Sequence, residues 1–227
     1  MTSSISLIII ALNEIEGLKV IGERVNKQKP FLNEIIMVDG GSTDGSAEYA
    51  KQLGWKVFIQ DENRKGIIEG LQIGIENSKS EYVIFFTPDN NCIPEKISEI
   101  HAKVQEGYDM VTVSRYFDGA KSYDDTLITS FGNWMFTTMV NVLFRAKYSD
   151  VLGIYRCFRV NLLKELKITL KLLSISTVLC IRCKKYNKKT IDIGGDEPNR
   201  VGGKSYMSIW KNGTQELYTI LKEFIIR

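Results

Sequence analysis

Acidic, amide and basic side chains follow four apolar stretches of this sequence, at the point where each stretch ends. The four groups are Ala11-Leu12-Asn13-Glu14, Asp39-Gly40-Gly41-Ser42, Thr87-Pro88-Asp89-Asn90-Asn91 and Ser114-Arg115. Carboxylate and amide oxygens are ligands for hard cations such as Mg²⁺, and the planar fork of arginine suits phosphate. Together these side chains have the chemistry to bind a phosphorylated ligand, with or without a divalent ion.

The elements that must position these groups alternate regularly in the first half of the chain. Strands are expected at 4–11, 34–39, 55–60, 81–86 and 109–115, and helices at 13–28, 42–54, 65–78 and 94–107. The helix at 42–54 is expected to take Ser42 or Thr43 as its N-cap. This order predicts an α/β fold with βαβ units, right-handed crossovers and a mostly parallel sheet. Because ligands bind at the carboxyl ends of strands in such sheets, the four groups are expected to share one rim.

The pattern changes after Arg115. A polar loop leads to an amphipathic stretch at 126–146, where a long helix is expected, and the short segment "SDVLGIYRCFR" follows at 149–159. A helix near 171–186, a strand in "KTIDIG", a loop in "DEPNRVGGKSY" and a last helix from about Ser205 complete the chain. Aromatic residues at helical spacing in 126–146 indicate either a packed core helix or a helix that lies on a membrane.

Length and composition exclude several classes of protein. A chain of 227 residues with a net charge of +3 suits one sizeable domain and does not indicate nucleic-acid binding. No apolar run is long enough for a membrane span, and the first residues do not resemble a signal peptide. The four cysteines and the single histidine, His101, are expected to be packing or surface residues. The run "RCKKYNKK" at 182–189 is either a solvated helix end or a contact for anionic lipid or phosphate.

Two common nucleotide-binding motifs are missing where they would be expected. A dinucleotide fingerprint needs G-x-G-x-x-G after the first strand, but the chain has "LNEIEG" there. A P-loop ends in G-K-[ST], and "GGSTDGS" has Ser46 at the position of the lysine. Neither a dinucleotide-dependent enzyme nor a P-loop NTPase is supported.

Six segments, in order, resemble family 2 glycosyltransferases of the GT-A fold, in the branch of dolichyl- and polyprenyl-phosphate sugar synthases. The segments are "IIIALNEIEG", "EIIMVDGGSTDGS", "RKGIIEGLQIGIENSKSEYVIFFTPDNNCIPE", "VTVSRY", "SDVLGIYRCFR" and "PNRVGGKSY". The chain departs from the family pattern at Ile10, Gly40, Thr87, Leu152 and Ile154. The resemblance implies a single GT-A domain over 1–227, with a nucleotide-sugar-binding half at 1–115 and an acceptor-facing half at 116–227.

The resemblance also implies roles for the residues of the first half. Asp39 would accept hydrogen bonds from a nucleobase, and the less favoured alternative is that it only caps the next helix. The remaining residues implied to bind nucleotide are Ala11, Asn13, Glu14, Ser42, Lys65, Pro88 and Asp89. Asp89 occupies the position of the second Asp of the family's Asp-x-Asp turn, which binds the metal, while Thr87 replaces the first. Asp89 and Asn91 are therefore expected to hold Mg²⁺ or Mn²⁺, which needs only one or two protein carboxylates when a diphosphate completes the site.

Catalysis of sugar transfer needs cations where charge builds on the leaving diphosphate. Asp89, Arg115, Arg200 and Lys204 are the expected catalytic residues, and the expected phosphate or acceptor contacts are Arg115, Asp150, Arg156, Arg200, Lys204 and Ser205. The family's glutamate base should fall near Ser176, where the chain has no acid. A lipid phosphate would need no base, because a phosphate monoester is already ionised near neutral pH.

The favoured function is transfer of a sugar from a GDP- or UDP-sugar to a polyprenyl phosphate or lipid-linked glycan, with inversion. The enzyme is expected in the cytoplasm, peripherally bound to the inner face of the membrane, and a homodimer is an alternative use of its apolar helix. A non-catalytic nucleotide-sugar-binding subunit with a membrane partner would explain the departures at Gly40, Thr87, Leu152 and Ser176 together. A nucleotidyltransferase is disfavoured, because "ALNEIEG" lacks a glycine-rich basic loop.

Overall fold

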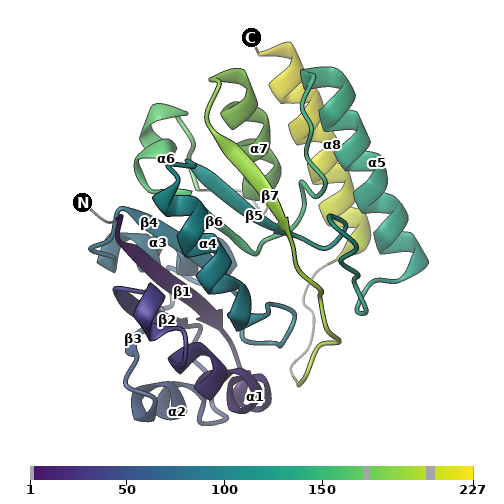
Figure 1. The fold of residues 1–227 in the computed structure, drawn as a ribbon. Coiled ribbons are helices and arrows are strands. Elements are labelled where there is room, and N and C mark those ends of the chain that lie inside the picture. Colours follow the sequence, from purple (N-terminus) through teal and green to yellow (C-terminus); the bar gives the residue numbers. More distant parts are fainter. Residues whose placement is uncertain (1–2, 171–173, 203–207, 227) are drawn as a thin grey trace.

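The computed structural model describes residues 3–170, 174–202 and 208–226. Its strands form a single mixed sheet, in which six run parallel and one runs against them (Figure 1). The strands are β1 (Ile5–Ala11), β2 (Glu34–Asp39), β3 (Lys56–Ile59), β4 (Tyr82–Phe86), β5 (Met110–Ser114), β6 (Arg156–Arg159) and β7 (Thr190–Gly194). The expected α/β fold with a mostly parallel sheet is confirmed.

The strand order β3-β2-β1-β4-β6-β5-β7 puts the carboxyl ends of the parallel strands on one edge. Strand β6 pairs antiparallel with both β4 and β5, so those two strands point the same way although they do not touch. No strand had been assigned to this segment from the sequence. Because β6 separates β4 from β5, the groups after β1, β2 and β4 lie together while Arg115 stands farther along the rim.

Helices cover both faces of the sheet. They are α1 (Ile15–Asn26), α2 (Ser46–Gln52), α3 (Ile67–Asn77), α4 (Ile97–Gln105), α5 (Leu127–Phe144), α6 (Asn161–Glu165), α7 (Ile175–Lys185) and α8 (Ile209–Ile225), with short 3₁₀ turns at Lys29–Phe31 and Pro94–Lys96. The expected helices are all present, although α8 begins four residues later than expected, with Ser208 as its N-cap.

Alternation along the buried strands divides the core into two layers. Leu7 and Ile9 of β1 pack with α1, α2 and α4, whereas Ile8 packs on the other face with α3, α5 and α7. Helix α3 approaches β1 closely, since a Cβ on Gly74 would lie 2.4 Å from the Ile8 side chain. Both faces of the sheet are thus buried, which explains the continuous apolar runs in its strands.

The turn before α2 differs from the expectation. The N-cap of α2 is Gly45, with φ of +91°, and neither Ser42 nor Thr43 caps the helix. The Ser42 hydroxyl donates to Asp39, and the Thr43 amide donates to Asn13. Both residues hold the turns of the rim together, so the helix begins only after that turn is complete.

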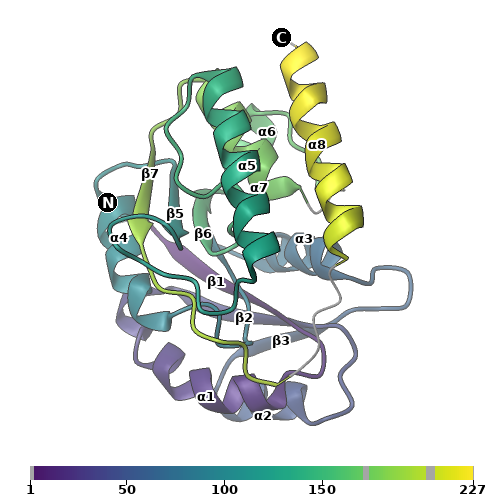
Figure 2. The ribbon, with the colours of Figure 1, turned by 90° about the vertical axis from the view of Figure 1, so that its right-hand side faces the viewer.

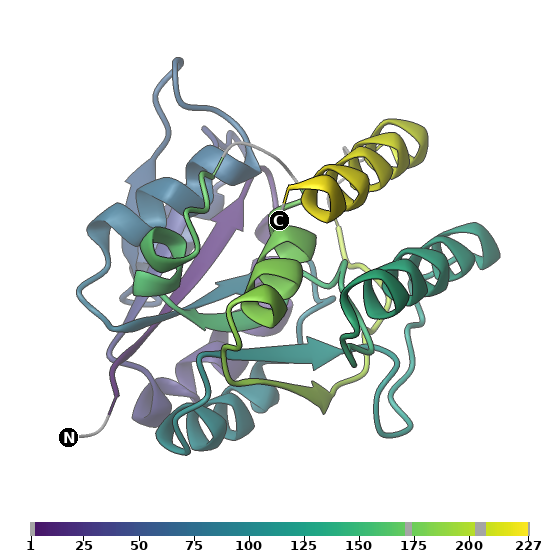
Figure 3. The same ribbon diagram turned by 90° about the horizontal axis from the view of Figure 1, so that it is seen from above.

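The second half of the chain adds a helical layer beside the sheet. Helices α5 and α8 lie next to each other, on the opposite side of the molecule from α1 and α2 (Figures 2 and 3). Thr126 and Thr129 form a capping box at the start of α5, which stabilises the helix where it leaves the rim. Within the described residues, no helix is both long and apolar enough to cross a membrane.

Candidate active site

The carboxylate of Asp39 lies at the end of β2 and is almost fully buried. Its Oδ1 accepts hydrogen bonds from the amides of Gly41 (3.2 Å) and Ser42 (2.9 Å) and from the Ser42 hydroxyl (2.6 Å). Among the described residues, Oδ2 receives one bond, from the Ser42 amide at 3.1 Å. The carboxylate therefore shapes its own turn, and Oδ2 is the oxygen with more capacity to accept a further donor.

The turns after β1 and β2 are joined by their polar side chains. The Asn13 amide donates to the Ser42 hydroxyl (2.8 Å), and the Asn13 side chain accepts from the amide of Thr43 (2.9 Å). Asn13 needs φ of +55° to do this, a conformation that asparagine tolerates better than most residues. Ala11, the last residue of β1, is buried beside Asp39 in register. Lys65 approaches from the other side, where its Nζ donates to the carbonyl of Gly40 at 2.7 Å.

Asp89 follows β4 and is also largely buried. Its Oδ1 accepts from the Thr87 hydroxyl (2.8 Å) and from the Asn91 amide (3.2 Å). Thr87 therefore orients the carboxylate in place of the missing aspartate. Helix α1 packs directly on this turn, because a Cβ on Gly17 would lie 2.2 Å from the carbonyl oxygen of Pro88.

One arginine joins the carboxylates of two different turns. Arg200 Nη1 donates to Asp89 Oδ2 at 2.8 Å, and Nη2 donates to Glu14 Oε1. Burial raises the pKa of Glu14 despite the opposing charge of Arg200, and the charge of Asp89 adds to the rise. Oε2 of Glu14 is buried without a hydrogen-bond partner among the described residues. This cluster thus places two acids around a single cation.

Residues 198–202 form a strap across the β4 turn. The amide side chains of Asn90 and Asn91 donate to the carbonyls of Asn199 (3.1 Å) and Pro198 (3.0 Å). The backbone amide of Val201 donates to the Asp89 carbonyl at 2.9 Å. The strap is therefore held by side-chain and backbone bonds as well as by Arg200.

A second charged cluster lies at the end of β5. Arg115 forms a two-pronged ion pair with Asp150 (2.8 and 3.2 Å) and contacts Glu197 at 3.4 Å. Burial opposes its charge, but these carboxylates hold the pKa of Arg115 well above its ordinary value. Burial also disfavours the charge of Asp150, yet Arg115 and the Gly153 amide keep the pKa of that carboxyl below its ordinary value. Asp150 thus positions Arg115 and has no oxygen turned to an open rim.

One residue expected to contact phosphate or acceptor, Arg156, is buried, and two others fall outside the described residues. Arg156 is only 1% exposed and donates to the carbonyls of Gly153 (2.7 Å) and Ser176 (3.0 Å) and to the sulfur of Cys180 (3.0 Å). Its guanidinium links β6 to α7, so its assignment as a phosphate contact is corrected to a structural role. Lys204 and Ser205 lie outside the described residues.

The sequence identified most of the rim but missed Glu197 and the joint role of Glu14. Glu197 also bonds the Ser122 hydroxyl, which ties the loop after β5 to the strap. The feature of the sequence that points to Glu197 is its position directly before the segment "PNRVGGKSY". In the part of the chain that the structure describes, no cluster of three or more acidic, histidine or cysteine side chains is arranged around a metal position. Two acids with one orphaned oxygen nevertheless fit an ion that takes its other ligands from water and a diphosphate.

Comparison with known proteins places this geometry in a family. The sequence profile described as Glycosyl transferase family 2 matches residues 6–167. The chain is 25% identical over 201 residues to glycosyltransferase AglJ of Haloferax volcanii, covering 82% of the chain and 64% of that protein. It is 26% identical over 220 residues to an undecaprenyl-phosphate 4-deoxy-4-formamido-L-arabinose transferase of Proteus mirabilis, covering 92% of the chain and 64% of that protein. The chain thus spans somewhat less than two thirds of the length of these relatives.

Solved structures agree on the fold. Glucosyl-3-phosphoglycerate synthase of Mycobacterium tuberculosis, in complex with Mn²⁺, UDP and phosphoglyceric acid, superposes with a TM-score of 0.71 at 17% identity. The match covers 98% of this chain and 78% of that one. The architecture, with its mostly parallel sheet and acidic rim, is that of a GT-A fold. Since the family profile extends over more than half of its residues, the chain belongs to glycosyl transferase family 2.

Proposed function

We propose that this protein transfers a sugar from a nucleotide-sugar donor to a polyprenyl phosphate or a related lipid-linked acceptor. The observation that carries the proposal is the rim cluster of Glu14, Asp89 and Arg200, with Asp39 on one side and Arg115 on the other. The Proteus relative, which is named for transfer involving undecaprenyl phosphate, supports the acceptor class. The mycobacterial structure, which contains UDP and Mn²⁺, supports a diphosphate donor.

In this proposal the first two turns bind the nucleoside. The Oδ2 atom of Asp39 accepts from a base N–H, while Asn13 and Ser42 hold that carboxylate in place. Ala11 and Lys65 border the same position, and Lys65 brings a positive charge to it. The geometry suits either a uracil or a guanine base, because both present N–H donors.

Asp89 is proposed to hold Mg²⁺ or Mn²⁺, with the free oxygen of Glu14 or the Asn91 side chain as a further contact. A bound divalent ion would neutralise negative charge on the leaving diphosphate. The Nδ2 of Asn91 donates to the Pro198 carbonyl, so Oδ1 is the atom of this side chain that would contact the ion. Thr87 keeps Asp89 in one orientation, which preserves a usable carboxylate although the usual second acid is absent.

Arg200 is proposed to exchange partners during the reaction. In the free protein its guanidinium neutralises Glu14 and Asp89. When an ion and a diphosphate enter, the same guanidinium is free to bind phosphate oxygens, which it suits by geometry. Arg115, fixed by Asp150, offers a second cation, and Lys204 and Ser205 remain candidates. No general base is needed when the attacking group is an ionised lipid phosphate.

The exposed face of α5 and α8 supports a location at a membrane surface. Its exposed apolar residues are Leu127, Ile128, Phe131, Trp134 and Val142 of α5, with Ile209, Trp210, Leu217, Tyr218, Leu221, Phe224 and Ile225 of α8. Such a face suits peripheral binding to the cytoplasmic side of a membrane, where a lipid acceptor is held. A homodimer that covers the same face is the alternative.

A non-catalytic nucleotide-sugar-binding subunit is the second candidate function. The departures at Gly40, Thr87 and Leu152 favour it, and so does the absence of an acid at Ser176, which is buried in the first turn of α7. The ion pairs of Arg200 also leave little unpaired charge for an ion in the free protein.

A paired binding and transfer experiment tests these functions. Thermal stability is measured with UDP, GDP and their sugars, with and without Mn²⁺, because a ligand of the folded state raises its stability. Transfer to a short-chain polyprenyl phosphate is then followed for the wild type, D89N and the surface control E48Q. We expect Mn²⁺-dependent stabilisation by one base, and a loss of transfer by about 100-fold or more in D89N only.

The alternatives give different results in the same assays. Nucleotide-sugar binding without transfer to any lipid or glycan acceptor would favour the binding subunit. Transfer that survives both chelation and D89N would contradict the proposed role of Asp89 as an ion ligand.

A further inference from the structure

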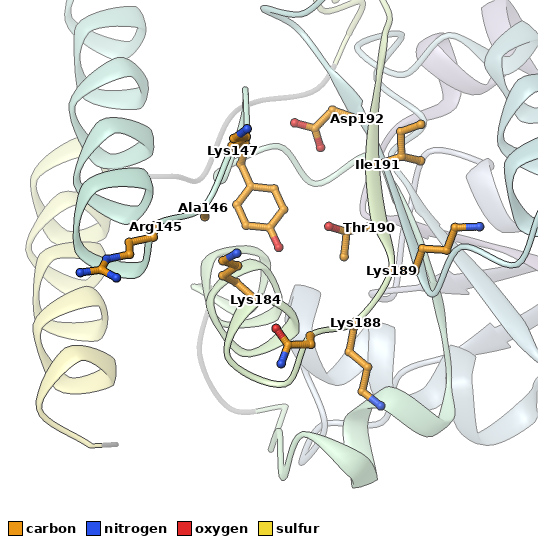
Figure 4. Close-up of a pocket in the computed structure, with 11 residues that line it drawn as sticks. Arg145, Ala146, Lys147, Lys184, Lys188, Lys189, Thr190, Ile191 and Asp192 are labelled. Carbon is orange, nitrogen blue, oxygen red and sulfur yellow. The ribbon is translucent and has the colours of Figure 1, made fainter.

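A basic pocket lies at the opposite end of the sheet from the rim. It has a volume of about 440 Å³ and opens between the end of α5, the end of α7 and the start of β7 (Figure 4). Its charged lining residues are Arg145, Lys147, Lys184, Lys188, Lys189 and Asp192. Strand β7 starts here and ends at the rim. Five strand residues at about 3.3 Å each put roughly 16 Å between the two ends, so one phosphate cannot reach both.

Several of these cations have no partner within the described part of the chain. Lys188 pairs with Glu165 at 2.6 Å, and Lys189 donates to the carbonyl of Glu106 at 2.8 Å. By contrast, no side-chain hydrogen bond or ion pair of Arg145, Lys147 or Lys184 occurs among the described residues.

The acid of the pocket does not neutralise these cations. Asp192 accepts from the Ser149 amide (2.7 Å) and hydroxyl (2.6 Å). Burial raises the pKa of this carboxyl, while the bonds from Ser149 oppose the rise. The pocket therefore has a clear excess of positive charge.

Compensation of helix dipoles explains only part of this charge. Arg145 is the C-cap of α5, and Lys184 lies in the last turn of α7, where the helix dipole favours a cation. Lys147 lies on the segment that follows α5, beyond both helix ends, and also lines the pocket (Figure 4). A dipole effect requires no concave site, whereas these residues line one.

Apolar side chains lie next to the pocket. Phe144 and Phe224 stack edge to face, with ring centroids 6.1 Å apart, at the adjoining ends of α5 and α8. Beside them, Val142 is 70% exposed and Ile225 is 79% exposed. A lipid with an anionic headgroup would therefore have its headgroup beside the cations of the pocket and its apolar chains beside these apolar side chains.

We propose that this pocket binds the phosphomonoester headgroup of an anionic lipid, as a second site separate from the acceptor site. A phosphomonoester carries about −1.5 to −2 charges near neutral pH, which matches the unpaired cations of the pocket better than a singly charged diester. The site would fix the α5 and α8 face against the membrane at one end, while the rim stays open to the donor. The proposal rests on the membrane location given above, but not on the identity of the sugar or the acceptor.

Vesicle binding tests the site. Binding is measured to neutral phosphatidylcholine vesicles, and to vesicles matched in surface charge with phosphatidic acid or phosphatidylglycerol. We expect the wild type to prefer phosphatidic acid. K147Q/K184Q should lose on the order of 30-fold in binding to these vesicles, at about 1 kcal/mol for each cation near the surface. The control K19Q/K51Q removes the same charge from exposed sites on α1 and α2 and should lose less than threefold.

Each other outcome contradicts the site. Equal binding to the two anionic vesicles, or equal loss in both variants, would mean that only general surface charge acts. Stabilisation of the wild type by millimolar inorganic phosphate, lost in K147Q/K184Q without any change in vesicle binding, would identify a soluble ligand and overturn the lipid. Nucleotide binding and transfer to a short-chain acceptor in detergent should be unchanged in both variants. Their failure in the wild type would count against the proposed function and not against this pocket.

Discussion

At the scale of single residues, the site consists of acids that share one arginine. Glu14 and Asp89 come from different turns, and Arg200 bonds both. The arginine lies 186 positions from Glu14 in the chain. The sequence predicted that each of the three faces the rim, but it could not predict their contact. No local pattern records a pairing over such a separation, because it depends on how the strap crosses the β4 turn.

The shared cation leads to a prediction about metal affinity. In R200Q the two carboxylates lose their partner, so we expect Mn²⁺ to bind the free protein more tightly, by roughly tenfold. Sugar transfer should nevertheless fall by about 100-fold, because the cation proposed to stabilise the leaving diphosphate has been removed. Mn²⁺ titration and initial rates measure the two effects. R64Q, which changes a partly exposed arginine that also pairs with two glutamates, is the matched control.

Tighter Mn²⁺ binding together with slower transfer in R200Q would support the proposal that Arg200 leaves Glu14 and Asp89 to bind the diphosphate. If Mn²⁺ affinity and transfer both fell in R200Q, Arg200 would serve only to shape the site. If neither changed, its contacts with Glu14 and Asp89 would be irrelevant to function.

At the scale of elements, the sequence predicts the helices and strands whose residues follow a regular pattern. It does not predict strand β6, whose residues break that pattern. The five strands and four helices of the first half follow from continuous apolar runs that alternate with helical patterns, and all of them are present. Strand β6 was missed because "RCFR" is short and carries Arg156, a residue that a sequence places at the surface. In the fold, carbonyl oxygens and a cysteine sulfur satisfy its buried guanidinium, which makes an internal position tolerable.

The contact of α7 with α8 contains an acid whose protonation is expected to control stability. Burial raises the pKa of Glu216 to about 7, although the Thr177 hydroxyl and the charge of Arg156 oppose the rise. Its Oε2 has no hydrogen-bond partner in residues 3–170, 174–202 and 208–226. The folded state therefore binds this proton more tightly than the unfolded chain does, where the pKa is near 4.5. The contribution of Glu216 to the free energy of unfolding should be most favourable below pH 4.5, should fall between pH 4.5 and 7, and should level off above that range.

Glu216→Gln removes this dependence. We expect the variant to be more stable than the wild type by roughly 1–3 kcal/mol at pH 8, with no difference near pH 4, as measured by urea unfolding. Glu223→Gln on the same helix is the control of opposite sign. Burial opposes the charge of Glu223, but Arg182 and Lys185 hold its pKa below the ordinary value, so this variant should lose stability at pH 8. A pH-independent difference for E216Q would refute protonation as the cause.

At the scale of the whole molecule, the sheet takes strands from both halves of the chain. Strands β6 and β7 come from residues 116–227 and extend the sheet that the first half builds. The turns after β1, β2 and β4 consequently lie on one side, while α5 and α8 stand on the other with their apolar residues exposed (Figure 2). The sequence predicted the long helix but left open whether its aromatic residues belong to the core. The fold divides them: Phe136 is buried, whereas Phe131 and Trp134 are exposed.

This division predicts which substitutions weaken membrane binding without harm to the fold. Trp134 is 62% exposed on α5, and Trp210 is 85% exposed on α8. Burying an apolar side chain of this size is worth roughly 1.5–3 kcal/mol, so W134Q/W210Q should bind neutral vesicles at least tenfold more weakly than the wild type. Thermal stability and transfer to a short-chain acceptor in detergent should stay within error. The control I59Q makes a similar change of polarity at an exposed position of edge strand β3 and should bind as the wild type does. Sedimentation velocity decides whether this face binds a membrane or a second copy of the chain. If the wild type is a dimer, and W134Q/W210Q is a monomer with unchanged vesicle binding, the face serves self-association.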